Sequence, residues 1–241
     1  PGCVVGDERI TLGNGTLARL ERLGSRHLER IHMQVRLGTG MYRNGWATRF
    51  HVYANQPLLE VTTETGKCIK GTYNHPLLTW NPKKRASEWR RLDELKKGDR
   101  LRVAPSIKCW KRALVPTGWE EPTYFHRSWH VQVPEFVDET LAGLIGYLVG
   151  DGWVRERSIG YTVAVSEMDL APRIGSMIAD SFGVSPRRGD RRNGVVYFEV
   201  NRTPVARWLR AVGERRVPES VFQSRNSVVA SFLRWLYEAD G

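Results

Sequence analysis

The chain has 241 residues, of which 41% are hydrophobic, enough for two small domains or one large one. Its longest apolar run, "LAGLIGYLVG" from Leu141, is about half the roughly 20 residues that a membrane-spanning helix needs. The N-terminus "PGCVVGDERI" lacks the basic and apolar regions of a signal peptide. These features exclude the membrane and secretory classes, and we expect a soluble, cytoplasmic monomer with no membrane partner.

The formal net charge of +11 favours an anionic partner, and nucleic acid is the usual one. An arginine-biased composition explains part of this charge, because no Lys follows Lys111 and Arg supplies the later positive charges. Arginine also suits phosphate and guanine. Cys3, Cys68 and Cys109 are odd in number and far apart, with no C-x-x-C pair, so neither a zinc site nor a disulfide framework is indicated.

Residues 1 to about 104 are predicted to be β-rich. In "FHVYANQPLLEVTTETG" and "CIKGTYNHPLLTW", short apolar runs alternate with Gly, Asn and Pro turn signals. "RLDELKKGDRLRV" adds a turn at Gly98-Asp99 and then a strand. The pattern predicts a compact all-β domain. Residues 105–134 are rich in Trp, Pro and His with little periodicity, and we interpret them as a connecting segment.

From Asp138 the pattern becomes mixed α and β. The predicted elements are a mostly buried helix "DETLAGLIGYLVGDG", a strand at Ser158–Ser166, a helix at 169–183, a strand and hairpin around Asn193-Gly194, a helix at 203–213 and a last helix "SVVASFLRWLYEADG". Asp169 and Thr203 are expected to cap their helices, and Gly183 to end the second one.

Two of these helices end alike. "LIGYLVGDG" runs from Leu144 and "LRWLYEADG" from Leu233, and both finish with Asp-Gly at the same offset. Helices that pack through small residues can bring their C-terminal ends, and so Asp151 and Asp240, together. Converging carboxylates repel unless a cation lies between them, so this arrangement fits divalent metal binding. Beside DNA phosphates it suits metal-assisted phosphodiester hydrolysis. The alternative is that both acids merely sit at exposed helix ends, where negative charge is mildly unfavourable.

These stretches resemble the two signature helices of the LAGLIDADG homing endonucleases, over roughly residues 135 to 241. The resemblance implies that Asp151 and Asp240 bind catalytic Mg²⁺, and that strand residues around Ser158–Ser166 and Arg187–Tyr197 contact double-stranded DNA. Glu238 is left out of the implied site.

The chain departs from that family in one respect. Many members keep a basic residue, often Lys, near the metals, and this half of the chain has no Lys. Arg155, Arg157 or Arg191 could supply the positive charge, or a residue beyond Gly241 could supply it.

The first half has its own constellation of reactive residues. Cys3 lies at the start, and "GTYNHPLLT" places Thr72 and His75 in a T-x-x-H spacing. A thiol can attack the carbonyl of the preceding Gly2–Cys3 peptide to give a thioester. His75 could supply a proton to the departing nitrogen, and Thr72 with backbone N–H groups could hold the oxyanion. Taken singly, Cys3 could instead be a small buried residue and His75 a core histidine.

The order "CVVGDERITLGNG", "GTYNHPLLTW", "LKKGDRL" resembles the N-terminal splicing blocks of an intein. It implies an all-β Hint fold, shared with hedgehog autoprocessing domains, followed by an incomplete α+β endonuclease domain. The implied organisation is residues 1–2 as N-extein remnant, 3–104 as the N-terminal part of the Hint domain, 105–134 as connector, and 135–241 as endonuclease up to its second signature helix. The chain is expected to be a fragment that lacks the C-terminal splice junction.

The resemblance implies protein self-splicing, which needs no cofactor, combined with Mg²⁺-dependent double-strand cleavage of DNA. The implied partners are the flanking exteins and the intein-free copy of the host gene. Two alternatives stay open, namely a DNA-binding module of this fold that no longer cuts, and an autoprocessing protein that cleaves without ligation.

Overall fold

The structure is a computed structural model, and it describes residues 2–38, 42–103, 114–122, 130–191, 194–213 and 216–240. The chain divides into two compact units, Pro1–Cys109 and Trp110–Gly241. The division lies inside the segment predicted as a connector. Val131, near the end of that segment, is buried in the core of the second unit.

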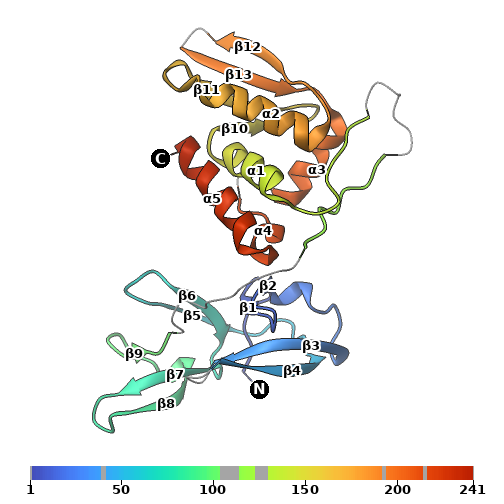
Figure 1. The fold of residues 1–241 in the computed structure, drawn as a ribbon. Coiled ribbons are helices and arrows are strands. Elements are labelled where there is room, and N and C mark those ends of the chain that lie inside the picture. The colour runs from blue at the N-terminus through green and yellow to red at the C-terminus, as the bar shows by residue number, and fades with distance from the viewer. Residues whose placement is uncertain are drawn as a thin grey trace. The chain divides into compact units, whose positions relative to one another are not determined.

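The described part of the first unit is built from short antiparallel strands, apart from two 3₁₀ turns at Leu20–Arg22 and Leu92–Glu94 (Figure 1). The strands are β1 (Arg9–Thr11), β2 (Leu17–Arg19), β3 (Glu29–Gly38), β4 (Tyr42–Phe50), β5 (Leu58–Thr62), β6 (Cys68–Thr72), β7 (Pro76–Asn81), β8 (Ala86–Arg91) and β9 (Arg100–Leu101). They form three two-stranded ribbons, β1-β2, β3-β4 and β5-β6, and a three-stranded sheet in the order β8-β7-β9. The prediction of a β-rich first unit is therefore confirmed.

Burial in this unit is shallow. Among its described residues, only Ala18 and Leu92 are fully buried hydrophobic side chains, whereas Trp46 and Trp89 are more than half exposed. The predicted turn at Gly98-Asp99 is present, because Gly98 has a φ of +94°, which a side chain would strain, and β9 follows it. The unit thus consists of ribbons held mainly by backbone pairing.

The second unit packs helices against a four-stranded antiparallel sheet in the order β10-β11-β13-β12 (Figure 1). Its elements are α1 (Glu139–Asp151), β10 (Gly152–Val154), β11 (Ile159–Ala164), α2 (Leu170–Phe182), β12 (Arg187–Arg191), β13 (Val195–Val200), α3 (Thr203–Gly213), α4 (Glu219–Gln223) and α5 (Asn226–Asp240). Each helix predicted from the sequence is present within a few residues. Strand β13 alternates, with Val196, Phe198 and Val200 buried toward the helices.

The helix ends match the sequence expectations in part. Gly183 ends α2 with a φ of +64°, as predicted. Asp169 makes no capping bond, because its backbone is already helical after a 3₁₀ turn. Thr203 lies inside the first turn of α3, since Ala206 N–H donates to the carbonyl of Arg202. Strands β12 and β13 pair as predicted, while Asn193 lies outside the described residues.

One core unites the second unit. Tyr147, Tyr161, Phe182 and Phe232 are its largest fully buried side chains and come from α1, β11, α2 and α5. Asp138 starts α1 by accepting a hydrogen bond from Leu141 N–H at 2.8 Å. Among the helices described, none is both long and apolar enough to cross a membrane.

Candidate functional sites

The structure brings Cys3 and Thr72 together at the end of β6. The backbone N–H of Cys3 donates to Thr72 Oγ1 at 2.9 Å, and Thr72 N–H donates to the Cys3 carbonyl at 2.8 Å. Val4 forms a β-bridge with Gly71, so the chain around Cys3 runs antiparallel to the end of β6. Thr72 is only 6% exposed. The amide of the Gly2–Cys3 peptide is therefore held by a buried hydroxyl.

Asn74 fixes the direction of that hydroxyl. Thr72 Oγ1 donates to Asn74 Oδ1 at 2.8 Å, a much better contact than its 3.4 Å approach to the Cys3 carbonyl. With its one proton given to Asn74, Thr72 accepts from Cys3 N–H and has no proton left for a Gly2 oxyanion. The sequence predicted that Thr72 holds the oxyanion, whereas the structure places its hydroxyl beside the backbone nitrogen of Cys3. Asn74 was missed, although an Asn two residues after a Thr is a common local hydrogen-bonding pattern.

His75 lies against the peptide that precedes Cys3. Its pKa is lowered, chiefly because the ring is half-buried, and this is partly offset by a contact with the Gly2 backbone and by the negative charge of Glu8. Its Nδ1 is buried and, among the described residues, has no partner with good hydrogen-bond geometry. At neutral pH the imidazole is thus mainly uncharged, and it lies within hydrogen-bonding reach of the Gly2 backbone.

The backbone after β8 holds the T-x-x-H turn in place. Leu92 N–H donates to the His75 carbonyl at 3.0 Å, and Asp93 N–H donates to the Tyr73 carbonyl at 3.0 Å. Both donors belong to the 3₁₀ turn Leu92–Glu94, and the Arg90 side chain donates to the last carbonyl of this turn. The turn that carries Thr72 and His75 is therefore fixed from outside by a second segment.

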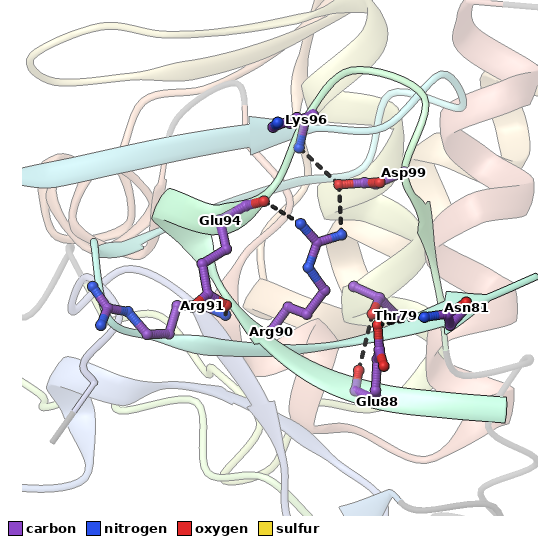
Figure 2. Close-up of polar contacts among 8 residues, drawn as sticks. All are labelled: Thr79, Asn81, Glu88, Arg90, Arg91, Glu94, Lys96 and Asp99. Carbon is purple, nitrogen blue, oxygen red and sulfur yellow. Dashed lines mark hydrogen bonds and ion pairs between the residues drawn. The ribbon is translucent and has the colours of Figure 1, made fainter. Parts of the chain in front are cut away.

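Arg90 and Asp99 brace that segment (Figure 2). The Arg90 guanidinium donates to Asp99 Oδ2 at 2.9 Å and also contacts the carbonyl of Glu94. Asp99 accepts a further bond from Lys96 N–H at 2.8 Å, which is the first cause of its lowered pKa. Asp99 belongs to the "LKKGDRL" stretch noted in the sequence, and its contacts give that stretch a structural part in positioning the site.

Cys68 does not join this site. Cys68 is exposed on β6, and its thiol donates to Glu60 Oε1 at 3.1 Å, which raises the pKa of the thiol. Cys109 lies outside the described residues. Among the cysteines that the structure describes, Cys3 alone adjoins Thr72 and His75.

In the second unit, α1 and α5 lie side by side and pack through glycines (Figure 1). A Cβ at Gly146 would lie 2.3 Å from the carbonyl oxygen of Phe232, and one at Gly143 would lie 2.4 Å from the Trp235 ring. Near the C-terminal ends, a Cβ at Gly150 would come within 2.6 Å of Ala239 Cβ. The helices therefore touch along their length, as their small residues indicate.

This packing brings Asp151 and Asp240 to one place. The pKa of Asp151 is raised by partial burial first, and then by the negative charges of Asp240 and Glu167. Asp240 adjoins Gly150, because a Cβ on that glycine would lie 3.5 Å from Asp240 Cβ. Glu167 follows β11 and was not singled out in the sequence. The ends of α1 and α5 thus bring negative charges close together.

The donor set fits a hydrated divalent cation better than an enclosed metal site. No group of three or more His, Cys, Asp or Glu residues that could hold a metal occurs in the described part of the chain. Two convergent carboxylates leave most positions to water and phosphate, as Mg²⁺ prefers. Of the basic residues considered as helpers, Arg155 lies over the Trp153 ring at 5.7 Å, and the Arg191 side chain lies outside the described residues.

The strands expected to contact DNA are β11, β12 and β13. On the sheet face away from the buried valines, Trp153 and Tyr197 lie 6.0 Å apart, ring centre to ring centre. Glycines leave room for both rings, because a Cβ at Gly160 would meet Trp153 at 2.0 Å and one at Gly189 would meet Tyr197 at 2.4 Å. This face therefore presents aromatic rings, and on β12 Arg187 lies on the same face, opposite Glu199 of β13.

No protein-family model matches the chain. Over its whole length the chain is 29% identical to a replicative DNA helicase DnaB of Rhodothermus marinus, of which it covers 24%, and 27% identical to a DnaB of Nostoc sp., of which it covers 26%. Over 79% of its length it is 28% identical to a polypeptide of the A-type ATP synthase of Pyrococcus abyssi, of which it covers 19%. The chain thus spans about a quarter or less of these curated relatives.

Similar solved structures include two inteins. A DnaB intein from Synechocystis sp. aligns with 42% of this chain and 67% of its own, with a TM-score of 0.35 and 24% identity. The TvoVMA intein aligns with 41% of this chain and 67% of its own, with a TM-score of 0.34 and 18% identity.

Proposed function

We propose that this chain belongs to a self-splicing protein of the intein type, with Cys3 as its first nucleophile. The observation that carries the proposal is the pairing of Cys3 with Thr72, with His75 beside the same peptide bond. Cys3 lies far from Thr72 and His75 in the sequence, and the three residues meet at one peptide bond. A thiol, a hydroxyl on the amide nitrogen and an imidazole beside the carbonyl are the groups that an N-to-S acyl shift requires.

The acyl shift is an isomerisation that needs no cofactor. The Cys3 sulfur bonds to the Gly2 carbonyl carbon, the Gly2–Cys3 C–N bond breaks, and the thiol proton ends on the freed amine of Cys3. Thr72 Oγ1 holds the departing nitrogen, and Asn74 keeps the Thr72 lone pair turned toward it. The uncharged His75 ring can accept the thiol proton and pass it on to the nitrogen.

The sequence relatives support an inserted element rather than a host domain. The same chain aligns with minor portions of a DNA helicase and of an ATP synthase polypeptide. A shared nucleotide-binding domain would explain this only if the chain had a phosphate loop, and it contains no G-x-x-x-x-G-K-[ST] sequence. A segment that recurs in differently named proteins, without their nucleotide-binding motif, is expected of an element that is inserted and later removed.

The acyl shift is tested by fusing a carrier protein upstream of Pro1 and adding dithiothreitol or hydroxylamine. Wild type should release the carrier at Gly2, and Cys3→Ala should not; equal release from both would overturn the assignment of the nucleophile. Ligation is tested on the full-length gene product by mass spectrometry. A joined product supports splicing, whereas cleaved but unjoined flanks support autoprocessing without ligation.

We further propose that the second unit is a DNA endonuclease of the LAGLIDADG type. The convergence of Asp151 and Asp240 at the ends of two glycine-packed helices favours it. When bound there, Mg²⁺ would supply a Lewis acid and an activated water for phosphodiester hydrolysis. Asp151 and Asp240 would hold it, while the β11–β13 face and its arginines would contact the DNA backbone.

The endonuclease proposal is tested on the full-length protein with DNA of the uninterrupted host gene. Mg²⁺-dependent double-strand cleavage that is lost in Asp151→Asn and Asp240→Asn would support it. Tight binding without cleavage, unchanged by these substitutions, would instead support a DNA-binding module that no longer cuts.

A further inference from the structure

We propose that the splice site accepts only glycine before the nucleophile, so that the substrate class is a Gly–Cys junction selected by the backbone of the T-x-x-H turn. The inference rests on the proposed acyl shift at Cys3 and concerns which upstream residue the site admits. The main-chain atoms of Asn74 and His75 determine this specificity, and Gly2 is the residue that they select.

The contacts of Gly2 leave no room for a side chain. A Cβ at Gly2 would lie 2.4 Å from His75 Cα, 2.8 Å from the Asn74 carbonyl oxygen and 2.9 Å from His75 N. Distances under 3.0 Å are essentially never seen for a real Cβ. All three neighbouring atoms are main-chain atoms, so no rotamer change or side-chain truncation at Asn74 or His75 would relieve the clash.

The obstructing backbone is itself fixed. His75 N–H donates to the Thr72 carbonyl at 2.9 Å, and the His75 carbonyl accepts from Leu92 N–H at 3.0 Å. The turn is therefore tied at both ends of His75 and cannot recede by the distance that a methyl group needs.

The junction strand cannot move away on its other side without losing its hydrogen bonds. A Cβ at Gly71 would lie 2.7 Å from the Cys3 carbonyl oxygen, so Cys3 is also in close backbone contact with β6. A shift that freed space at Gly2 would break the pair of bonds between Cys3 and Thr72. A side chain at position 2 would therefore move the Cys3 amide away from Thr72. The same shift would move the Gly2 carbonyl away from His75.

The test uses the carrier fusion with Gly2→Ala, Gly2→Val and, as a matched control, Gly175→Ala, where an added Cβ has nothing within 4 Å. In the thiol reaction, the thiol displaces Cys3 from the Gly2 thioester, so the carrier leaves as a thioester and Cys3 regains its thiol and gains a free amine. We expect Gly2→Ala to slow release at least tenfold, Gly2→Val to slow it further, and Gly175→Ala to leave it unchanged.

Hydrogen exchange of the Cys3 amide gives a readout independent of activity. It should be protected in wild type by Thr72 and exchange freely in Gly2→Ala. Release from Gly2→Ala within twofold of wild type, with the amide still protected, would overturn the inference. If wild type releases no carrier, the proposed acyl shift fails, and the contact at Gly2 is then judged by amide protection alone, where equal protection in both proteins overturns it.

Discussion

Cys3 and Thr72, separated by 69 positions in the sequence, exchange hydrogen bonds in both directions: Cys3 N–H to Thr72 Oγ1 at 2.9 Å, and Thr72 N–H to the Cys3 carbonyl at 2.8 Å. The first bond reaches the nitrogen that would leave during an acyl shift, while the second fixes the register of the strand. The geometry at the junction is therefore set by the end of β6 rather than by local sequence.

Removal of the Thr72 hydroxyl should slow the acyl shift without unfolding the unit. Thr72→Val preserves shape but leaves Cys3 N–H without its acceptor, and a lost hydrogen bond of about 1.4 kcal/mol corresponds to about a tenfold slower reaction. Thr72→Ser keeps the oxygen and should retain most of the rate. Carrier release by dithiothreitol measures both. Equal rates for the Val and Ser variants would show that the hydroxyl takes no part.

Asn74 should matter only through Thr72. Asn74→Ala frees the Thr72 proton to turn toward other acceptors, so we expect a smaller loss of rate than in Thr72→Val. In the double variant the loss should be no greater than in Thr72→Val alone, because residues that act through one contact are not additive. Additive losses in this double-mutant cycle would contradict a positioning role for Asn74.

The pKa of His75 predicts a dependence of stability on pH. Burial lowers this pKa below the ordinary value of 6.5, so on acidification the unfolded chain takes up its proton first. The free energy of unfolding should therefore fall as the pH drops from about 6.5, the pKa in the unfolded chain, toward the lower pKa in the folded protein. The full contribution of His75 should be present when the pH is above about 6.5. Urea unfolding between about pH 8 and about pH 5.5 measures this slope. The slope of the unfolding free energy against pH should be smaller in His75→Gln. The slope should be unchanged in His32→Gln, which replaces an exposed histidine.

The sequence predicted the helices of the second unit well, because their apolar faces have helical periodicity and their ends carry Gly or Asp signals. It also predicted the approach of Asp151 to Asp240, since glycine spacing on α1 indicates where a neighbour can come close. It could not predict that Thr72 binds the nitrogen of Cys3, because that depends on the proton given to Asn74. Nor could it predict the Gly2 contact, which involves only backbone atoms brought together by tertiary structure.

Repulsion at the ends of α1 and α5 predicts stabilisation by divalent cations. In the absence of metal, Asp151→Asn should leave the Tm unchanged or raise it, because it removes one of two neighbouring negative charges. Millimolar Mg²⁺ or Ca²⁺ should raise the Tm of wild type through binding to the folded state, and should not raise that of Asp151→Asn or Asp240→Asn. Thermal unfolding with and without EDTA tests this. An equal metal response in all three proteins would place the cation elsewhere.

The contact between Gly146 and Phe232 should control the pairing of α1 with α5. An alanine at Gly146 places a methyl group 2.3 Å from the Phe232 carbonyl oxygen, so the helices must separate, at an expected cost of about 1–3 kcal/mol. Gly175→Ala makes the same chemical change in α2, where nothing lies within 4 Å, and should stabilise the protein by up to about 1 kcal/mol through helix propensity. The opposite signs, measured by urea unfolding, separate helix propensity from helix packing.

Because the separation of α1 from α5 also draws Asp151 away from Asp240, Gly146→Ala should weaken the rise in Tm that Mg²⁺ produces, whereas Gly175→Ala should leave that rise intact.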